Sequence, residues 1–183
     1  MKELSLNILD IVENSVKAKA SLTEITLDET DTSLVITVKD NGCGMTKEVL
    51  LSVENPFYTT RTTRKVGLGI PLFKMAAEQT GGFITLSSVS EKDNAENHGT
   101  VISGTFYKNH IDYTPLGDIV STITTLIQGH PDTDFLFTHN KNGKTVSLDT
   151  RQIREILDGV PLNSFEVIEW IEGYLKEGYL EIN

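Results

Sequence analysis

Lys39-Asp40-Asn41-Gly42-Cys43-Gly44-Met45 is the stretch that decides the fold of this chain. It follows Leu34-Val35-Ile36-Thr37-Val38, an apolar run rich in β-branched residues that predicts a β-strand. Asp40 is therefore expected where a strand ends. Gly42 and Gly44 let the backbone turn and approach a flat ligand with no Cβ in the way. The same residues also fit a hairpin turn. A short helix over 46–51, with Thr46 near its cap, fits the following residues better than a second strand does.

The composition limits the class of protein. A chain of 183 residues suggests one domain, or one domain with an appendage. Sixteen Lys and Arg residues against 26 Asp and Glu residues give a net charge of −10, which disfavours nucleic acid as a partner. Cys43 is the only cysteine, so a disulfide framework is excluded. Without an apolar run of about 18 residues or a signal peptide, the sequence predicts a soluble cytoplasmic protein with no membrane contact.

The residues from about Glu3 to Ala20 carry the spacing of an amphipathic helix. On the face opposite its apolar side, Asp10, Asn14 and Lys17 fall within about 60° of one another. One interpretation is a solvated face. The other is a functional face, because a carboxylate, a carboxamide and an ammonium group one turn apart suit a base, a metal and a phosphate. The carbonyl oxygen of Asn is a fitting ligand for Mg²⁺ beside phosphates.

Two further segments complete the pattern of the N-terminal part. Residues 24–29 alternate as a strand and are expected to lie antiparallel to the strand that ends at Asp40. After a polar loop with three basic residues over 55–65, Gly67-Leu68-Gly69-Ile70-Pro71 opens a helix to about Thr80 and exposes backbone N–H groups to an anion. This pattern is neither a Walker loop nor a dinucleotide fingerprint. With strands over 83–89 and 100–107, the order of elements predicts an α/β fold, a two-layer α+β sandwich.

Residues 1–107 resemble the GHKL ATPase superfamily, and within it the ATP-binding domain of bacterial histidine kinases. Four motifs occur in the order of that family. They are the N box from Asp10 to Ala18, the G1 box Asp40-Asn41-Gly42-Cys43-Gly44, the F box Asn55-Pro56-Phe57-Tyr58-Thr59-Thr60-Arg61, and the G2 box Gly67-Leu68-Gly69. Gly99-Thr100 resembles a weaker last motif. The resemblance implies a Bergerat-type ATP-binding fold, with ATP and Mg²⁺ as cofactors.

The resemblance also implies roles for individual residues. Asp40 would accept the adenine amino group, Asn14 would hold the Mg²⁺ that bridges the phosphates, and Lys17 would contact phosphate. Residues from Phe57 to Gly69 would form a lid over the ATP, and Asp10 would be the candidate base. The remaining expected ATP contacts are Gly42, Gly44, Met45, Phe57, Thr59, Thr60, Arg61, Arg64, Lys65, Gly67, Leu68, Gly69 and Thr100.

The sequence departs from the family pattern in three places. At the position of Asp10, the hydrolysing branch of the superfamily carries Glu and the kinase branch usually carries Asn. The chain begins at the N-box helix, so we expect no sensor or phosphoacceptor domain before it. The second glycine motif ends in Ile70 where leucine is commoner.

Residues 108–183 lie outside the resemblance and predict a smaller mixed α/β extension. A helix over 116–127, a hairpin turning at Asn142-Gly143 and a helix capped by Asp149 are expected. A last helix from Ser164 to about Lys176, followed by Tyr179-Leu180-Glu181-Ile182, gives the order of a winged helix. Residues 149–183 hold three Lys or Arg against eight Asp or Glu. That charge favours a partner-docking or dimerising module over a DNA reader.

Two classes of function follow from these observations. The first is a stand-alone ATP-dependent protein kinase or slow ATPase that acts in signal transduction on an unidentified protein partner, with anti-sigma serine kinases as a similar small group. The second is a non-catalytic module whose partner affinity depends on nucleotide. A homodimer is compatible with both. His110-Ile111-Asp112-Tyr113 invites comparison with a phosphoacceptor box, but it follows the ATP-binding part and lacks the usual acidic residue after the histidine. We interpret it as a coincidence.

Overall fold

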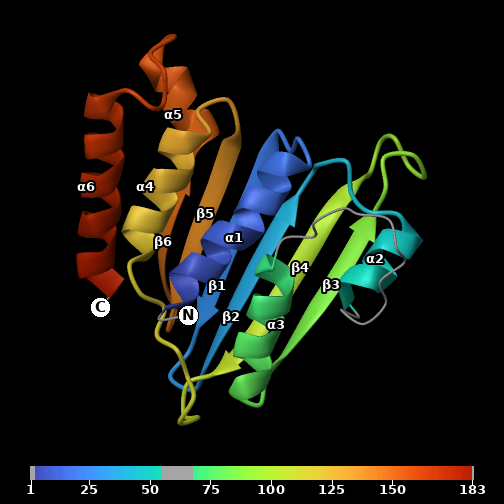
Figure 1. The fold of residues 1–183 in the computed structure, drawn as a ribbon. Helices are drawn as coiled ribbons and strands as arrows, with labels where there is room; N and C mark the ends of the chain where they lie inside the picture. Colours follow the sequence, from blue (N-terminus) through green and yellow to red (C-terminus); the bar gives the residue numbers. More distant parts are fainter. Residues whose placement is uncertain (1–2, 55–67, 183) are drawn as a thin grey trace.

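One mixed sheet forms the frame of the molecule in the computed structural model, which describes residues 3–54 and 68–182 (Figure 1). Its strands are β1 (Leu22–Glu29), β2 (Ser33–Asp40), β3 (Phe83–Val89), β4 (Gly99–Tyr107), β5 (Asp134–Lys141) and β6 (Lys144–Asp149). Their order across the sheet is β3-β4-β2-β1-β5-β6. The helices are α1 (Leu4–Lys17), α2 (Lys47–Glu54), α3 (Gly69–Gln79), α4 (Ile119–Gly129), α5 (Thr150–Leu157) and α6 (Phe165–Ile182).

The pairing of the strands joins the N-terminal and C-terminal parts of the chain. β1 and β2 are antiparallel neighbours, with Thr23 opposite Asp40, which confirms the prediction for these two strands. On its other side β1 pairs in parallel with β5, from Leu22 opposite Asp134 to Glu29 opposite Lys141. The sheet therefore continues without a break across the expected boundary at residues 107 and 108.

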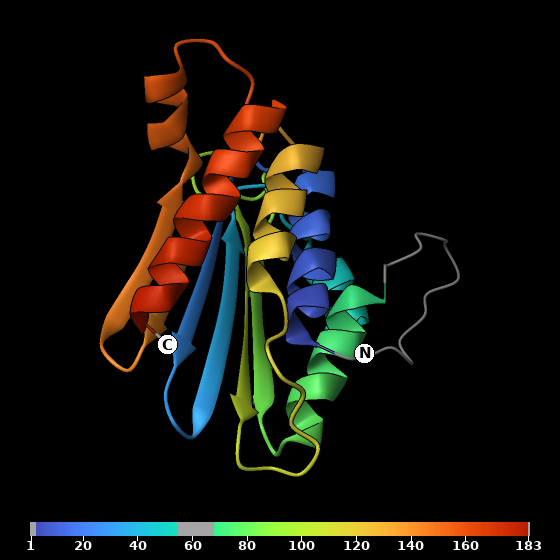
Figure 2. The same ribbon diagram turned by 90° about the vertical axis from the view of Figure 1, so that its left-hand side faces the viewer.

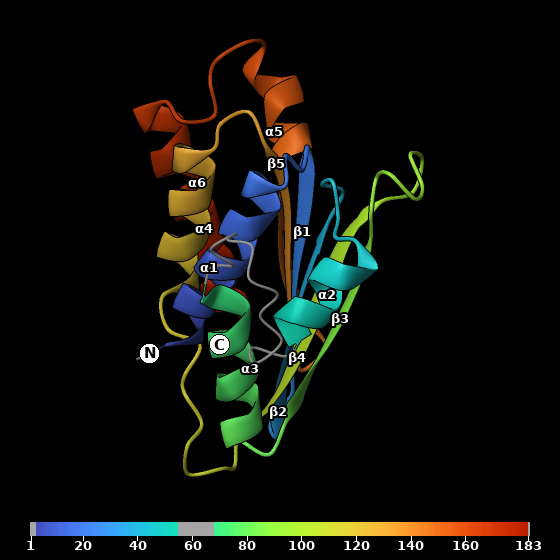
Figure 3. The ribbon, with the colours of Figure 1, turned by 45° about the vertical axis from the view of Figure 1, so that its right-hand side comes forward.

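Helices α1, α3, α4 and α6 cover one face of the sheet, and none of the described helices lies over the other face (Figures 2 and 3). This two-layer arrangement follows from alternation in the strands, because every second side chain is apolar and buried. In β2 the buried side chains are Leu34, Ile36 and Val38, and they pack under the apolar face of α1. The two-layer α/β sandwich predicted from the sequence is confirmed.

A glycine in β4 lets α3 lie close to the sheet. Phe73 of α3 packs edge-on against Phe106, with 5.4 Å between the ring centroids. A Cβ added to Gly104 would lie 2.6 Å from the Phe73 ring. Only a residue without a side chain fits there, so Gly104 and the two rings together fix the position of α3 over β4.

In the C-terminal part, the predicted turn and helix cap are confirmed and one prediction is wrong. Asn142 and Gly143 have positive φ and turn β5 into β6, and the Asp149 carboxylate accepts a hydrogen bond from the Arg151 N–H at the start of α5. The expected winged-helix order is wrong, because α6 continues as a helix to Ile182. Leu175 and Ile182 extend the buried face of this helix, and that burial outweighs the strand-like pattern of its last four residues.

Among the helices that the structure describes, none combines the length and apolar character that a membrane crossing requires.

Candidate functional site

Asp40 ends β2 and is held by two hydrogen bonds. The Ser15 hydroxyl of α1 donates to Oδ2 over 2.7 Å, and the Gly42 N–H donates to Oδ1 over 2.9 Å. Two carboxylate oxygens can accept about four hydrogen bonds, so both oxygens keep capacity for a ligand. Because one donor lies on α1 and the other in the following turn, the carboxylate is oriented before any ligand binds.

The turn after Asp40 is packed tightly against α1 and β3. The Cys43 N–H donates to the Ala18 carbonyl over 2.9 Å, and a Cβ on Gly42 would lie 2.8 Å from the Ala18 side chain. Gly44 has a φ of +63°, and a Cβ there would lie 1.9 Å from the Val89 carbonyl oxygen. No strand follows this turn directly, so the hairpin interpretation is wrong and the short-helix prediction is confirmed by α2.

Asp10, Asn14 and Lys17 lie on α1 as the helical spacing predicted. Asp10 and Lys17 are exposed and Asn14 is half-buried. Within the part of the chain that the structure describes, none of the three side chains has a hydrogen-bond or ion-pair partner. Among the described residues, no polar contact therefore holds these three side chains in place.

The start of α3 reaches α1 beside Asp10. Leu68 precedes this helix and is 73% exposed, while Gly69 opens it. A Cβ on Gly69 would lie 3.1 Å from the Asp10 Cβ. The N-terminus of α3 thus lies next to Asp10, and the backbone N–H groups at a helix N-terminus can bind an anion.

Thr100 belongs to a network of hydroxyl groups behind the turn. It pairs with Asp40 across β4 and β2, and its hydroxyl lies 2.8 Å from that of Ser88. Ser88 in turn accepts from the Met45 N–H over 2.8 Å. Met45 is therefore positioned through its backbone. His98 adds a contact from the β3–β4 loop, with Nδ1 2.5 Å from the Gly42 carbonyl oxygen.

Sequence reasoning missed three residues that hold this site, Ser15, Ser88 and His98. Ser15 carried a signal, since it is a small polar residue on the face of α1 that otherwise packs against the sheet. Ser88 and His98 carried none, because their contacts with Met45 and Gly42 join segments more than 40 residues apart in the chain.

Seven of the expected ATP contacts lie outside the described residues. They are Phe57, Thr59, Thr60, Arg61, Arg64, Lys65 and Gly67. Of the remaining predicted residues, Asp40, Gly42, Gly44, Met45 and Thr100 lie together at the end of β2. Asp10 adjoins Gly69 near the middle of α1, and the Leu68 side chain is exposed. In residues 3–54 and 68–182, no group of three or more His, Cys, Asp or Glu side chains is placed to hold a metal ion.

A second polar cluster lies between the sheet and α6, beside a cavity of about 310 Å³. His139 is 2% exposed, and its ring nitrogens lie 2.7 Å from the Tyr179 hydroxyl and 3.0 Å from Glu29 Oε2. Lys108 pairs with Glu29 over 2.7 Å. Burial lowers the pKa of His139 in spite of the nearby Glu29 carboxylate. Burial also raises the pKa of Tyr113, near Glu29, to about 12. His139, Tyr179, Glu29 and Lys108 therefore satisfy one another within this cluster.

Comparison with known proteins identifies the family of the N-terminal part of the chain. The family described as histidine kinase-, DNA gyrase B- and HSP90-like ATPase matches residues 2–110. Sporulation kinase C of Bacillus subtilis is 30% identical over 92 residues, which cover 49% of this chain and 21% of that protein. The signal transduction histidine-protein kinase AtoS of Escherichia coli is 28% identical over 89 residues, which cover 49% of this chain and 14% of AtoS. The chain thus spans about a fifth or less of these relatives.

Solved structures show the same fold. The MutL ATPase domain of Aquifex aeolicus, complexed with ADP, superposes with a TM-score of 0.53 at 18% identity, covering 86% of this chain and 70% of that one. The N-terminal domain of a DNA repair protein gives a TM-score of 0.56 at 16% identity, covering 81% and 53%. The resemblance drawn from the four motifs is confirmed.

Proposed function

This chain belongs to the histidine kinase-, DNA gyrase B- and HSP90-like ATPase family, and we propose that it binds ATP with Mg²⁺ around Asp40 and acts as a kinase or slow ATPase on a protein partner. Membership of the family makes the matched residues 2–110 an ATP-binding domain. The observation that carries the assignment of the site is the Asp40 carboxylate, which Ser15 and Gly42 hold at the end of β2 with accepting capacity to spare.

Asp40 is suited to recognise the adenine base. A carboxylate accepts the hydrogen bond of an exocyclic amino group, and the glycines beside it allow the flat ring to approach the backbone. Ser15 and Gly42 orient the two oxygens before binding, so little freedom is lost when the base arrives. Behind Asp40, the Ser88 hydroxyl contacts both the Met45 N–H and the Thr100 hydroxyl, and so fixes the position of these two residues.

The phosphates would extend along α1 towards the start of α3. Ser15 contacts Asp40 while Asp10 adjoins Gly69, and five residues of helix separate the two points by about 7.5 Å. The open carboxamide of Asn14 lies between them. Mg²⁺ often uses one or two protein ligands together with phosphates, so the single Asn14 oxygen fits this kind of site. Bound Mg²⁺ would neutralise phosphate charge, and Lys17 would add a further positive charge.

Asp10 is the candidate general base, and its geometry favours slow chemistry. A base must come within about 2.6–3.2 Å of the proton it takes. Asp is one methylene shorter than Glu and falls about 1.5 Å short from the same helical position. A misplacement near 1 Å can lower a rate about a hundredfold. The Asp10 carboxylate also has no hydrogen-bond partner among residues 3–54 and 68–182 to orient it.

The short Asp10 side chain, which no described residue orients, also supports a second candidate function. This function is a regulatory module that binds ATP without hydrolysing it. In that case the nucleotide would change the affinity for a partner by favouring one conformation. The two functions share the binding site and differ only in the chemistry at Asp10.

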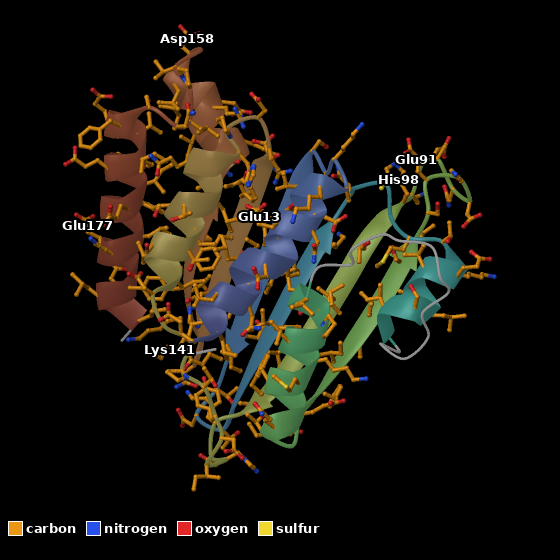
Figure 4. All side chains as sticks on the ribbon, in the orientation of Figure 1. Glu13, Glu91, His98, Lys141, Asp158 and Glu177 are labelled. Atoms are coloured by element: carbon orange, nitrogen blue, oxygen red, sulfur yellow. The ribbon has the colours of Figure 1, made fainter. Side chains whose placement is uncertain are left out.

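ATP labelled at the γ-phosphate separates these functions. A kinase transfers the label to an added partner, a slow ATPase releases it as phosphate, and a binding module does neither. Asp10→Glu should speed release, and Asp10→Asn should abolish it with binding nearly intact. Glu13→Gln is a matched control on the same helix, because the Glu13 carboxylate pairs with His130, the residue that follows α4, and lies outside the predicted site. Figure 4 labels Glu13 on α1. Fast hydrolysis that Asp10→Ala leaves unchanged would contradict the role of Asp10.

A further inference from the structure

Helix α6 buries one side and leaves an aromatic pair in solvent on another. Val167, Ile171 and Leu175 are buried against the sheet and α4. Trp170 and Tyr174, one turn apart, are 54% and 44% exposed. Their rings stack with centroids 5.4 Å apart and 17° between the planes. Large aromatic side chains that contribute little to the core are typical of interaction surfaces.

Gly173 leaves an opening next to this pair. A Cβ added to it would meet no atom within 4 Å. Glycine destabilises the interior of a helix relative to alanine, and no close packing explains its presence here. Gly178, on the same helix, differs because a Cβ there would lie 3.1 Å from Val146. The opening at Gly173 lets another chain approach the two rings.

The charge around the rings is negative. Helix α6 contains five Glu residues and one Lys, and that Lys176 is paired with Glu172. Glu166 and Glu177 have no ion-pair partner in the described part of the chain. Figure 4 shows Glu177 at the outer margin of the molecule. At 100° per residue, Glu166, Trp170, Gly173, Tyr174 and Glu177 fall within about 100° of the helix surface. We call these five residues the α6 outer face.

The aromatic rings and carboxylates of the α6 outer face indicate which kind of partner it binds. Arg and Lys side chains stack on Trp and Tyr rings through cation–π contacts, and carboxylates beside the rings strengthen the attraction. A second copy of this chain would bring Glu against Glu, which repels. We propose that the α6 outer face docks an arginine- or lysine-rich segment of a partner protein. This surface is separate from the residues assigned to ATP, so the proposal does not depend on the proposed function.

Trp170 gives a direct test, because it is the only tryptophan of the chain. The full chain, without nucleotide, is titrated with a short oligo-arginine peptide while tryptophan fluorescence is recorded. We expect a saturable change that added salt weakens, and no change with an oligo-glutamate peptide of equal length. An unchanged fluorescence with oligo-arginine at low salt would overturn the proposal.

Variants separate this face from the general negative charge of the protein. Glu166→Gln with Glu177→Gln should weaken the peptide about threefold to tenfold, as expected for two surface charge pairs. Glu91→Gln with Glu96→Gln removes the same charge from the exposed β3–β4 loop and should bind like the wild type. Figure 4 shows Glu91 at the end of the molecule far from α6. Equal weakening by both double variants would contradict a docking site on α6.

A third variant tests the rings and the possibility of a second copy. Trp170→Ala with Tyr174→Ala should weaken a dye-labelled oligo-arginine peptide, measured by fluorescence anisotropy, at least as much as the loss of the two carboxylates. Circular dichroism checks that this variant folds. Peptide binding unaffected by this variant would overturn the proposal. Sedimentation that shows wild-type self-association, abolished by the same variant, would also overturn it by making the face an interface between copies.

Discussion

Two regions of the molecule, one around α1 and one around α5 and α6, differ in how their buried polar groups are paired. On the α1 side, Asn7 is 1% exposed, and neither atom of its amide has a hydrogen-bond partner among the described residues. The hydroxyls of Ser5 and Thr23 are likewise buried without a partner there. Native proteins leave few buried polar groups unpaired, so such groups gathered on one side of a molecule call for an explanation.

On the α5 and α6 side, the buried polar groups satisfy one another. The Thr150 hydroxyl is buried, accepts from the Phe135 N–H and donates to Asp134, each over 2.9 Å. Arg154 donates to the same Asp134 carboxylate over 2.7 Å. His139 is held between Glu29 and Tyr179. Polar groups around α5 and α6 therefore stabilise the fold, whereas Asp10, Asn14 and Lys17 on α1 have no polar partner among the described residues.

The largest effect on stability is expected from Thr150→Val. The two side chains have a similar shape, but the variant leaves the buried Phe135 N–H without its acceptor. We expect the free energy of unfolding to fall by about 1–3 kcal/mol in urea titrations. Thr145→Val is the control, because Thr145 is exposed and should change stability by no more than about 0.5 kcal/mol. Equal effects of the two variants would show that the buried hydrogen bonds of Thr150 contribute no more to stability than the exposed Thr145 side chain does.

Asn7→Leu should act in the opposite direction. It replaces a buried amide that has no partner among the described residues by an apolar side chain of the same branching, and we expect stability to stay level or rise by about 1 kcal/mol. The same urea titrations measure it. A loss as large as that of Thr150→Val would show that Asn7 is partnered in the folded protein, and the two regions would then be alike.

The smallest effect concerns pH. Burial lowers the pKa of His139 below its ordinary 6.5, so the unfolded chain takes up the proton first as the pH falls. Stability should therefore decrease between pH 6.5 and the lower pKa of the folded protein. Glu29, whose pKa is lowered by Lys108 against the effect of burial, adds a second loss below about pH 4.5. His139→Gln should flatten the first step. An unchanged pH profile of unfolding would contradict the role of His139.

Local chemistry made much of this molecule predictable from the sequence. The end of β2 at Asp40, the turn at Asn142-Gly143 and the cap at Asp149 each depend on a few neighbouring residues. The parallel pairing of β5 with β1 joins residues about a hundred positions apart, and no local pattern encodes it. Ser15 and Ser88 became visible only when their distant partners were placed. The end of α6 was missed because burial of Ile182 decides it.

Calorimetric titration of ATP with Mg²⁺ into the wild type and Asp40→Ala tests the central claim most directly. A hydrogen bond to a charged group contributes about 1.5–3 kcal/mol, so the variant should bind ATP about ten- to 150-fold more weakly. Asp132→Ala removes an exposed carboxylate from the turn between α4 and β5 and should leave the affinity unchanged. If folded Asp40→Ala binds ATP as tightly as the wild type, the nucleotide is not read at the end of β2, and the account of this site is contradicted.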